Sequence, residues 1–296
     1  MPHHVLALLN QPSADQPPHV EGAPAFAFVD PGAPQLSALD LGATRGDGIF
    51  ESISVGNGTP QALDHHLRRF ASSAAKLDLP VPDAAAWRAA ILASVDELQP
   101  GAEAWVKTVL TRGVEGDGRP TGWVYAAHAP DHSRTRVEGI RVVMLDRGYR
   151  HDVEITSPWL LAGAKTLSYA VNRSVAREAA RRGADDVIFV SSDGYVLEGP
   201  TSTVVFKRGN AILTPGTGLG ILDGTTQASI FRYAESLGFE TGFELLTPAE
   251  LAATDAAWLV SSVRLAAPIR ELDGREFAVD AELSAGINAF LLSLRE

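Results

Sequence analysis

The sequence predicts an α+β protein built from two domains. Its 296 residues are about twice the length of a typical domain of ~150 residues. The first half reads as strands, then helices, then strands, and a polar stretch with proline and glycine separates it from a second series of strands and helices. We therefore expect an amino-terminal extension, a small α/β domain, a linker and a larger domain, at residues 1–24, 25–128, 129–139 and 140–296.

The elements of the small domain follow from alternation, caps and turns. Residues 1–24 contain five prolines, so we expect a loosely ordered extension. Asp64 is expected to cap the helix that follows it, and the glycines between residues 39 and 52 predict a loop with tight turns. The predicted strands are 25–29, 53–55, 61–63, 104–113 and 121–129, and the predicted helices are 65–79 and 84–98.

The larger domain is expected to mix hairpins with helices. Its turns are marked by Ser-Asp-Gly and Gly-Asn sequences, and its first helix stops at Gly183. The predicted strand segments are 140–145, 186–199, 202–214, 256–262 and 270–277, and the predicted helices are 172–183, 225–238 and 281–296.

Composition and charge exclude several classes of function. The net charge of −11 repels polyphosphate, so nucleic acid is not an expected partner. The absence of cysteine excludes disulfides, thiolate nucleophiles and cysteine metal sites, and no metal site is predicted. No apolar run approaches 18 residues, and no basic segment precedes the short apolar stretch Val5–Leu9. We therefore expect no membrane span, no signal peptide and a cytoplasmic location.

The sequence has only four lysines that could carry amine chemistry. Of these, Lys165 is preceded by the most apolar residues, in PWLLAGAKTLSYA. Desolvation lowers the pKa of a lysine and frees its amine for Schiff-base formation. The alternative is a lysine at a strand end that reaches solvent. Glu198, near the end of a predicted strand, would share a pocket with Lys165 or be a solvated acid at a turn.

Two further features would suit an anion. The Gly-Thr-Thr turn at 224–226 opens a predicted helix, whose free backbone donors and dipole attract negative charge. Arg69 lies on the helix face away from Leu67 and Phe70. The alternatives are an ordinary helix cap and a solvated helix surface.

The order of five sequence blocks is more informative than any one of them. GDGIFES, HHLRRFASSA, KTLSYAVN, VLEGPTSTVVF and GILDGTT together resemble the class IV aminotransferase family, the fold-type IV pyridoxal-phosphate enzymes, over residues 25–275. The resemblance implies a D-amino-acid-transaminase-like fold with pyridoxal 5'-phosphate in the interdomain cleft. It also implies a homodimer, because the family's sites lie near a subunit interface.

The resemblance assigns roles residue by residue. Lys165 matches the lysine that forms the Schiff base and shuttles the proton, and Glu198 matches the carboxylate on the pyridine nitrogen. The positions that match phosphate ligands are Arg69, Thr225, Thr226 and Ser262. Two details depart from the common pattern: Thr203 stands where many members have Asn, and the turn reads D-G-T-T where P-G-x-T is common.

The strand WVKTVLTRG bears on the reaction. It is similar to the K-V-V-I-S-R-G block of 4-amino-4-deoxychorismate lyases, with Lys107 and Arg119 as candidate ligands of substrate carboxylates. Branched-chain transaminases tend to carry arginine at the position of Lys107, and D-amino-acid transaminases place tyrosine just before G-D-G, where this chain has residues 43–45, Ala-Thr-Arg. The resemblance thus favours a lyase that eliminates pyruvate and yields 4-aminobenzoate, a folate precursor.

Three alternatives stay open. Lys107 would otherwise be an outward-facing strand lysine. The protein would otherwise be a class IV transaminase for D-amino acids or branched-chain amino acids, or a non-catalytic cofactor-binding relative. The Lys165 and Glu198 pair argues against the last of these.

Overall fold

A computed structural model describes residues 3–11, 24–99, 101 and 103–295. The chain forms two compact units. Unit 1 comprises Met1–Pro130, Ala164–Tyr169 and Leu294–Glu296, and unit 2 comprises Asp131–Gly163 and Ala170–Ser293. Among the described residues, no helix combines the length and the apolar composition needed to cross a bilayer.

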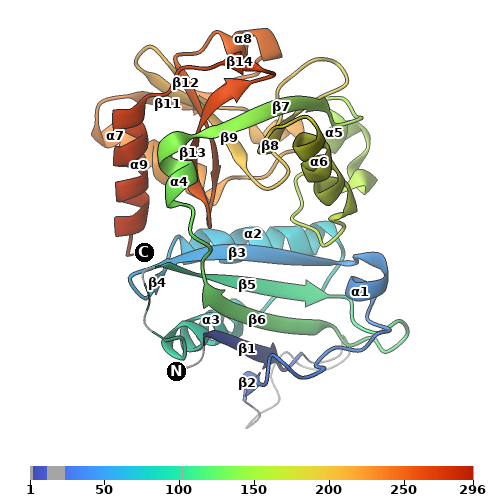
Figure 1. The fold of residues 1–296 in the computed structure, drawn as a ribbon. Helices are drawn as coiled ribbons and strands as arrows, with labels where there is room; N and C mark the ends of the chain where they lie inside the picture. Colours follow the sequence, from blue (N-terminus) through green and yellow to red (C-terminus); the bar gives the residue numbers. More distant parts are fainter. Residues whose placement is uncertain (1–2, 12–23, 100, 102, 296) are drawn as a thin grey trace. The chain divides into compact units, whose positions relative to one another are not determined.

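Unit 1 is an antiparallel sheet with helices on one face. Its elements are β1 (His4–Leu9), β2 (Phe26–Val29), α1 (Leu41–Arg45), β3 (Gly48–Gly56), β4 (Thr59–Pro60), α2 (Leu63–Lys76), α3 (Ala84–Asp96), β5 (Glu103–Thr111) and β6 (Thr121–His128). The strand order is β2-β1-β6-β5-β3-β4. Helices α2 and α3 pack on the sheet (Figure 1), where Phe70 of α2 meets Trp87 of α3 edge to face with ring centroids 4.9 Å apart. The predicted α+β class is confirmed in this unit.

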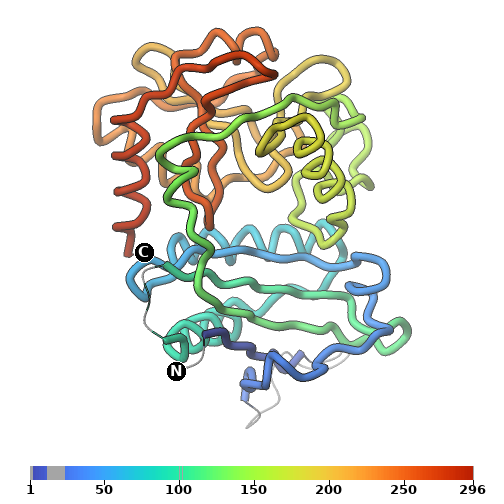
Figure 2. Tube along the Cα trace, viewed as in Figure 1, coloured from blue at the N-terminus to red at the C-terminus, as the bar shows by residue number. Residues whose placement is uncertain are grey.

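The amino-terminal segment corrects one prediction. Residues 4–9 are not a loose extension but strand β1, which pairs with β2 on one side and with β6 on the other. Val5, Ala7 and Leu9 alternate along it and are buried, so the strand supplies every second side chain to the core. In Figure 2 the dark-blue trace of β1 runs beside the green trace of β6. The rest of the predicted extension is only partly described: the structure includes residues 3, 10, 11 and 24, whereas residues 1–2 and 12–23 lie outside the described residues.

The glycine-rich stretch and the start of α2 also differ from expectation. Part of the predicted loop is helix α1, capped by Asp40, whose carboxylate accepts the N–H of Gly42 at 2.8 Å. Helix α2 begins at Leu63 rather than after Asp64, and its N-cap Ala62 provides no side-chain hydrogen bond. Asp64 instead lies in the first turn and forms an ion pair with Arg88.

The segment containing Lys165 belongs to unit 1, not to the larger domain in which it was expected. Strand β4 pairs with β3 only near the end of β3, at Val55 and Gly56. The beginning of the same strand receives the segment instead: the N–H of Phe50 donates to the carbonyl of Lys165 at 3.0 Å, and the N–H of Leu167 donates to the carbonyl of Gly48 at 2.8 Å. These bonds satisfy edge groups of the sheet and fix the backbone on both sides of Lys165.

The predicted linker contains structure of its own. Helix α4 (Ser133–Glu138) lies within it and belongs to unit 2. Arg136 of this helix donates through Nε to the carbonyl of Arg264 at 2.9 Å and through Nη2 to the carbonyl of Val263 at 3.3 Å. These bonds join α4 to the turn that precedes a strand of unit 2, so residues 133–138 are part of that unit.

Unit 2 is a mixed sheet with helices packed on it. Its further elements are β7 (Ile140–Asp146), α5 (Val153–Thr156), α6 (Ala170–Arg181), β8 (Asp186–Val190), β9 (Thr203–Arg208), β10 (Ala211–Thr214), α7 (Thr225–Ser236), β11 (Glu240–Phe243), α8 (Pro248–Ala252), β12 (Ala256–Ser261), β13 (Leu265–Leu272), β14 (Arg275–Glu276) and α9 (Ala281–Ser293). The order is β11-β10-β9-β12-β13-β7-β8, with β14 paired to β13. Strands β13, β7 and β8 run parallel, as do β10 and β11.

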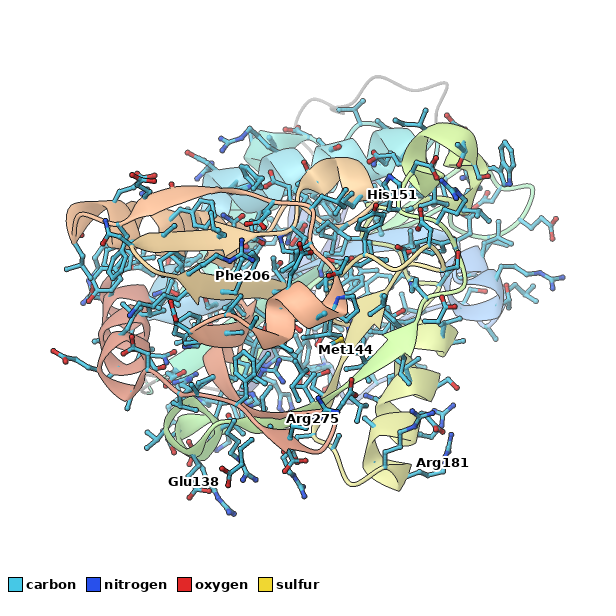
Figure 3. The ribbon with its side chains drawn as sticks, turned by 90° about the horizontal axis from the view of Figure 1, so that it is seen from above. Glu138, Met144, His151, Arg181, Phe206 and Arg275 are labelled. Carbon is cyan, nitrogen blue, oxygen red and sulfur yellow. The ribbon has the colours of Figure 1, made fainter. Side chains whose placement is uncertain are left out.

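The core of unit 2 lies between this sheet and its helices. Phe206 of β9 is fully buried and Met144 of β7 packs against the same cluster; both are labelled in Figure 3. Helices α7 and α9 pack on each other and on β12 and β13, whereas α6 packs on β7 and β8 (Figure 1). The buried indole N–H of Trp258 donates to Ser284 Oγ of α9 at 2.8 Å. The sequence did not predict β11, α5 or α8, because each is short.

Candidate functional site

Lys165 is held by backbone bonds from two directions. Its carbonyl accepts the N–H of Phe50 in β3, and its own N–H donates to Ser73 Oγ in α2 at 3.1 Å. Its Nζ lies 4.7 Å from the centroid of the Phe50 ring. A cation this close to an aromatic face is stabilised by the ring quadrupole. Lys165 is therefore a half-buried lysine in a fixed position on the edge of the unit 1 sheet.

The environment of Lys165 differs from the one expected. Apolar residues precede the lysine in the sequence, yet Trp159 is 73% exposed and Leu160 55% exposed. The apolar contact comes instead from Phe50, more than 100 positions earlier in the chain. The apolar group beside the amine is therefore the Phe50 ring of β3, and not the exposed Trp159 or Leu160.

Lys107 shares the ring that Lys165 touches. It lies in β5, where it pairs with Ser52, while Val109 two positions on pairs with Phe50. Side chains two apart on a strand share a face, so Lys107 and Phe50 are on the same side of the sheet. Lys107 Nζ lies 5.0 Å from the centroid of the Phe50 ring, and burial lowers the pKa of this ammonium.

Arg119 is in a different place. It is exposed in the loop between β5 and β6, and the hairpin closes at the pair Thr111–Thr121. Lys107 pairs with Tyr125, four positions further into the ladder. At ~3.4 Å per residue, these four positions place Lys107 ~14 Å along the strands from the end of the hairpin that carries Arg119. The structure does not bring Lys107 and Arg119 together.

Arg69 is part of a buried ion-pair network that the sequence reasoning missed. Its Nε and Nη2 donate to the two carboxylate oxygens of Glu51 at 2.7 and 2.6 Å. The Arg69 side chain is 10% exposed and that of Glu51 only 1%, whereas Arg68 is exposed. Arg69 is thus not a solvated surface residue, because the carboxylate draws its guanidinium against the sheet.

His66 completes this network. Its Nδ1 lies 2.8 Å from Glu51 Oε2. Burial raises the pKa of Glu51, but the charge and hydrogen bonds of Arg69, with those of His66, outweigh it and hold that pKa far below the usual range. Burial lowers the pKa of His66 below 6.5, so the ring is neutral at pH 7. The ionised carboxylate has no proton to give, and His66 therefore donates from Nδ1.

A local signal for this network is present in the sequence. Glu51 occupies an inward position of β3 between two buried isoleucines, Ile49 and Ile53. A carboxylate in an apolar alternation requires a partner. The candidate partners, one helical turn apart in α2, are His66 and Arg69.

Glu198 lies in unit 2, tied to the turn that precedes α7. Its Oε2 accepts the N–H of Leu222 at 3.2 Å, and its carbonyl accepts the N–H of Phe189 in β8 at 2.9 Å. Burial raises the pKa of nearby Tyr149, and the negative charge of Glu198 adds to this effect. Arg147 donates to the Tyr149 hydroxyl at 3.1 Å and lies 4.5 Å from the Phe189 ring centroid.

The start of α7 has the features of an anion site. Its N-cap is Gly224, which provides no side-chain hydrogen bond, so the amides of the first turn have no side-chain cap. Thr225 and Thr226 are 3% and 8% exposed, and Thr225 Oγ1 lies 3.4 Å from Ser262 Oγ. Backbone amides, hydroxyl groups and the positive end of a helix dipole form a donor set that suits a phosphate.

Thr203, which stands where many family members have Asn, contacts the N-cap of α7. A Cβ on Gly224 would lie 2.6 Å from Thr203 Oγ1, closer than two such atoms approach. Thr203 therefore packs directly against the N-cap of α7, and only glycine fits opposite it.

Within the described residues, no group of three or more histidine and acidic side chains is arranged to hold a metal ion.

Comparison with known proteins agrees with the resemblance in the sequence. Residues 48–272 match the family model described as amino-transferase class IV. A bifunctional aminodeoxychorismate lyase / D-amino acid transaminase from Mycobacterium tuberculosis is 44% identical over 258 residues, which are 84% of this chain and 89% of that protein.

Solved structures share the fold. A fold IV-transaminase, CpuTA1 from Curtobacterium pusillum, is 55% identical, with a TM-score of 0.94 over 99% of this chain and 98% of that one. A hypothetical aminotransferase from M. tuberculosis, solved in a PLP-bound form and with α-ketoglutarate and PMP, is 41% identical, with a TM-score of 0.86 over 90% of this chain and 96% of that one. The predicted two-domain, fold-type IV architecture is confirmed.

Proposed function

The chain belongs to the amino-transferase class IV family, and from this premise we propose that it is a pyridoxal 5'-phosphate enzyme in which Lys165 binds the cofactor covalently. The bound cofactor supplies an electron sink that stabilises a carbanion on the substrate. The position of Lys165 supports the assignment, since bonds to β3 and α2 hold its backbone and the Phe50 ring holds its ammonium. The Nζ of Lys165 would also accept the substrate proton and return it.

The remaining assignments follow the donor chemistry of each residue. Arg69, oriented by Glu51, is proposed to bind the cofactor phosphate together with the first turn of α7 and the hydroxyls of Thr225, Thr226 and Ser262. A guanidinium and uncapped helix amides fit a dianion. Glu198, oriented by the N–H of Leu222, is proposed to keep the pyridine nitrogen protonated.

For the reaction, we propose an aminodeoxychorismate lyase that releases pyruvate and 4-aminobenzoate. The observation that supports it is Lys107, whose ammonium lies on the same aromatic ring as that of Lys165. A cation at this position would bind a carboxylate of the substrate next to the reacting amine. The relative from M. tuberculosis carries this activity in its name.

Transamination of D-amino acids is a second candidate. Arg119 is exposed and separated from Lys107, so these two residues provide one cation beside Lys165 rather than the pair that a dicarboxylate substrate would use. A small D-amino acid needs only one. The same M. tuberculosis relative is named for both activities.

The deciding experiment compares the two substrates on one preparation. We expect kcat/KM for aminodeoxychorismate to exceed that for D-alanine with 2-oxoglutarate, measured as 4-aminobenzoate and keto-acid formation. If D-alanine or a branched-chain amino acid wins by more than about tenfold, about 1.4 kcal/mol of transition-state preference, the lyase proposal fails. Lys165→Ala is the control and must lose both activities. It must also lose the cofactor label that borohydride fixes on Lys165 in the wild type.

We further propose a homodimer. Ile155, Trp159 and Leu160 are 80%, 73% and 55% exposed within one short stretch of unit 2, an apolar concentration typical of contact surfaces. Sedimentation equilibrium is expected to give twice the chain mass, and a concentration-independent monomer would exclude the dimer.

A further inference from the structure

We propose that Lys107 keeps the Lys165 amine ready to react, because its positive charge, held against the same Phe50 ring, disfavours the protonated form of Lys165. The inference rests on the proposed function in that Lys165 must react as a neutral amine. Lys107 is thereby a positioning and tuning residue, in addition to any contact it makes with substrate.

The geometry brings the two charges close together. Neither nitrogen lies more than 5.0 Å from the ring centroid, so the two ammonium groups are at most about 10 Å apart. The ring itself is fixed, since Tyr169 contacts it edge to face with centroids 5.5 Å apart. Phe50 is 8% exposed. The ring beside both ammonium groups is therefore almost fully shielded from solvent.

The magnitude is sufficient to matter. Two unit charges about 10 Å apart, in an effective dielectric of about 20, interact by the equivalent of about one pKa unit, against a few tenths in bulk water. A lysine with the ordinary pKa of about 10.4 is almost wholly protonated at pH 7.5, and each unit of lowering multiplies the neutral fraction by about ten.

The charged groups of the Arg69 network in unit 1 do not supply the repulsion that Lys107 exerts on the Lys165 ammonium. Arg69 and Glu51 carry opposite charges and are paired through two hydrogen bonds. His66 is neutral, since burial lowers its pKa. Among the described residues, by contrast, no carboxylate lies within ion-pair distance of Lys107. The charge of Lys107 is therefore not neutralised by an ion-pair partner among these residues.

The test uses the full-length protein without cofactor. Competitive acetylation across pH, read by peptide mass spectrometry, gives the pKa of each lysine separately. Lys107→Met is expected to raise the pKa of Lys165 by about one unit, which is about a tenfold loss of labelling rate near neutral pH. Lys107→Arg keeps the charge and is expected to leave the Lys165 pKa within 0.3 unit of wild type, as is Lys207→Met, which removes the lysine paired with Asp280 in unit 2.

The outcomes are distinct. An unchanged Lys165 pKa in Lys107→Met, or an equal shift in Lys207→Met, overturns the proposal. Lys107→Gln provides a second neutral variant should Lys107→Met fail to fold, and in wild type 1 M salt is expected to raise the Lys165 pKa by screening. Because the cofactor is absent, a borohydride label found on another lysine would refute the proposed function without altering this result.

Discussion

Glu51 and Arg69 form a two-armed ion pair on the helix-covered face of the unit 1 sheet, with both nitrogen–oxygen distances under 2.8 Å. Glu51 lies on β3 and Arg69 on α2, so the pair fastens the helix to the strand next to the Lys165 segment. The carboxylate accepts both bonds and fixes the plane of the guanidinium. It thereby determines which donors Arg69 presents to an anion.

Replacing Glu51 with Gln is expected to lower the free energy of unfolding by about 3–5 kcal/mol, because the change leaves a buried guanidinium without its counter-charge. Urea denaturation of the full chain measures it. Asp64→Asn, which breaks the exposed ion pair with Arg88, is the matched control and is expected to cost less than about 1 kcal/mol. Equal losses of unfolding free energy in the two variants would show that the buried ion pair stabilises the fold no more than the exposed one.

The same network predicts that stability decreases with acid. The folded pKa of His66 is below its ordinary 6.5, so its neutral form favours the fold above pH 6.5, and this contribution is lost as pH falls toward the lowered value. The folded pKa of Glu51 is also lowered from 4.5, so its contribution is present above pH 4.5 and is lost below it. The titrations of His66 and Glu51 therefore both decrease stability as pH falls.

Urea midpoints are therefore expected to fall in two steps, the first below pH 6.5 and the second below pH 4.5. His66→Asn, which keeps a hydrogen-bond donor but does not titrate, is expected to remove the first step. A wild-type midpoint that stays constant from pH 8 to pH 5 would contradict the buried, neutral state of His66.

Replacing Arg69 with Ala is expected to weaken pyridoxal-phosphate affinity by ~2–4 kcal/mol, the loss typical of removing one partner of a buried charge pair. Equilibrium dialysis of the cofactor measures it. Arg68→Ala removes the adjacent, exposed arginine and is expected to leave the affinity unchanged. The phosphate lies elsewhere if the two variants behave alike.

Replacing Glu198 with Gln is expected to reduce turnover at least tenfold more than it reduces cofactor affinity. The amide still accepts the N–H of Leu222 and holds the turn, but it cannot stabilise a protonated pyridine nitrogen. The measurement is kcat beside the cofactor Kd. A parallel loss of both would indicate that Glu198 supports the turn and nothing more.

Local sequence patterns were enough to predict the well-marked helices and the family. Helices α3, α7 and α9 lie close to the predicted ranges 84–98, 225–238 and 281–296, and the order of the motifs led to the class IV family that the family model confirms. Asp83, the N-cap of α3, illustrates why: the carboxylate accepts the N–H groups of Ala85 and Ala86, a contact between near neighbours in the chain.

The pairing of segments that are distant in the chain could be seen only in the folded protein. Strand β1 was hidden because its pairing partner β6 lies more than 100 residues away, and the prolines that follow it suggested disorder. Lys165 was assigned to the wrong unit for the same reason, since its partners are the backbone of β3 and the ring of Phe50. Periodicity reports which face of an element is buried, but not what covers it, because pairing and burial depend on residues that local sequence does not contain.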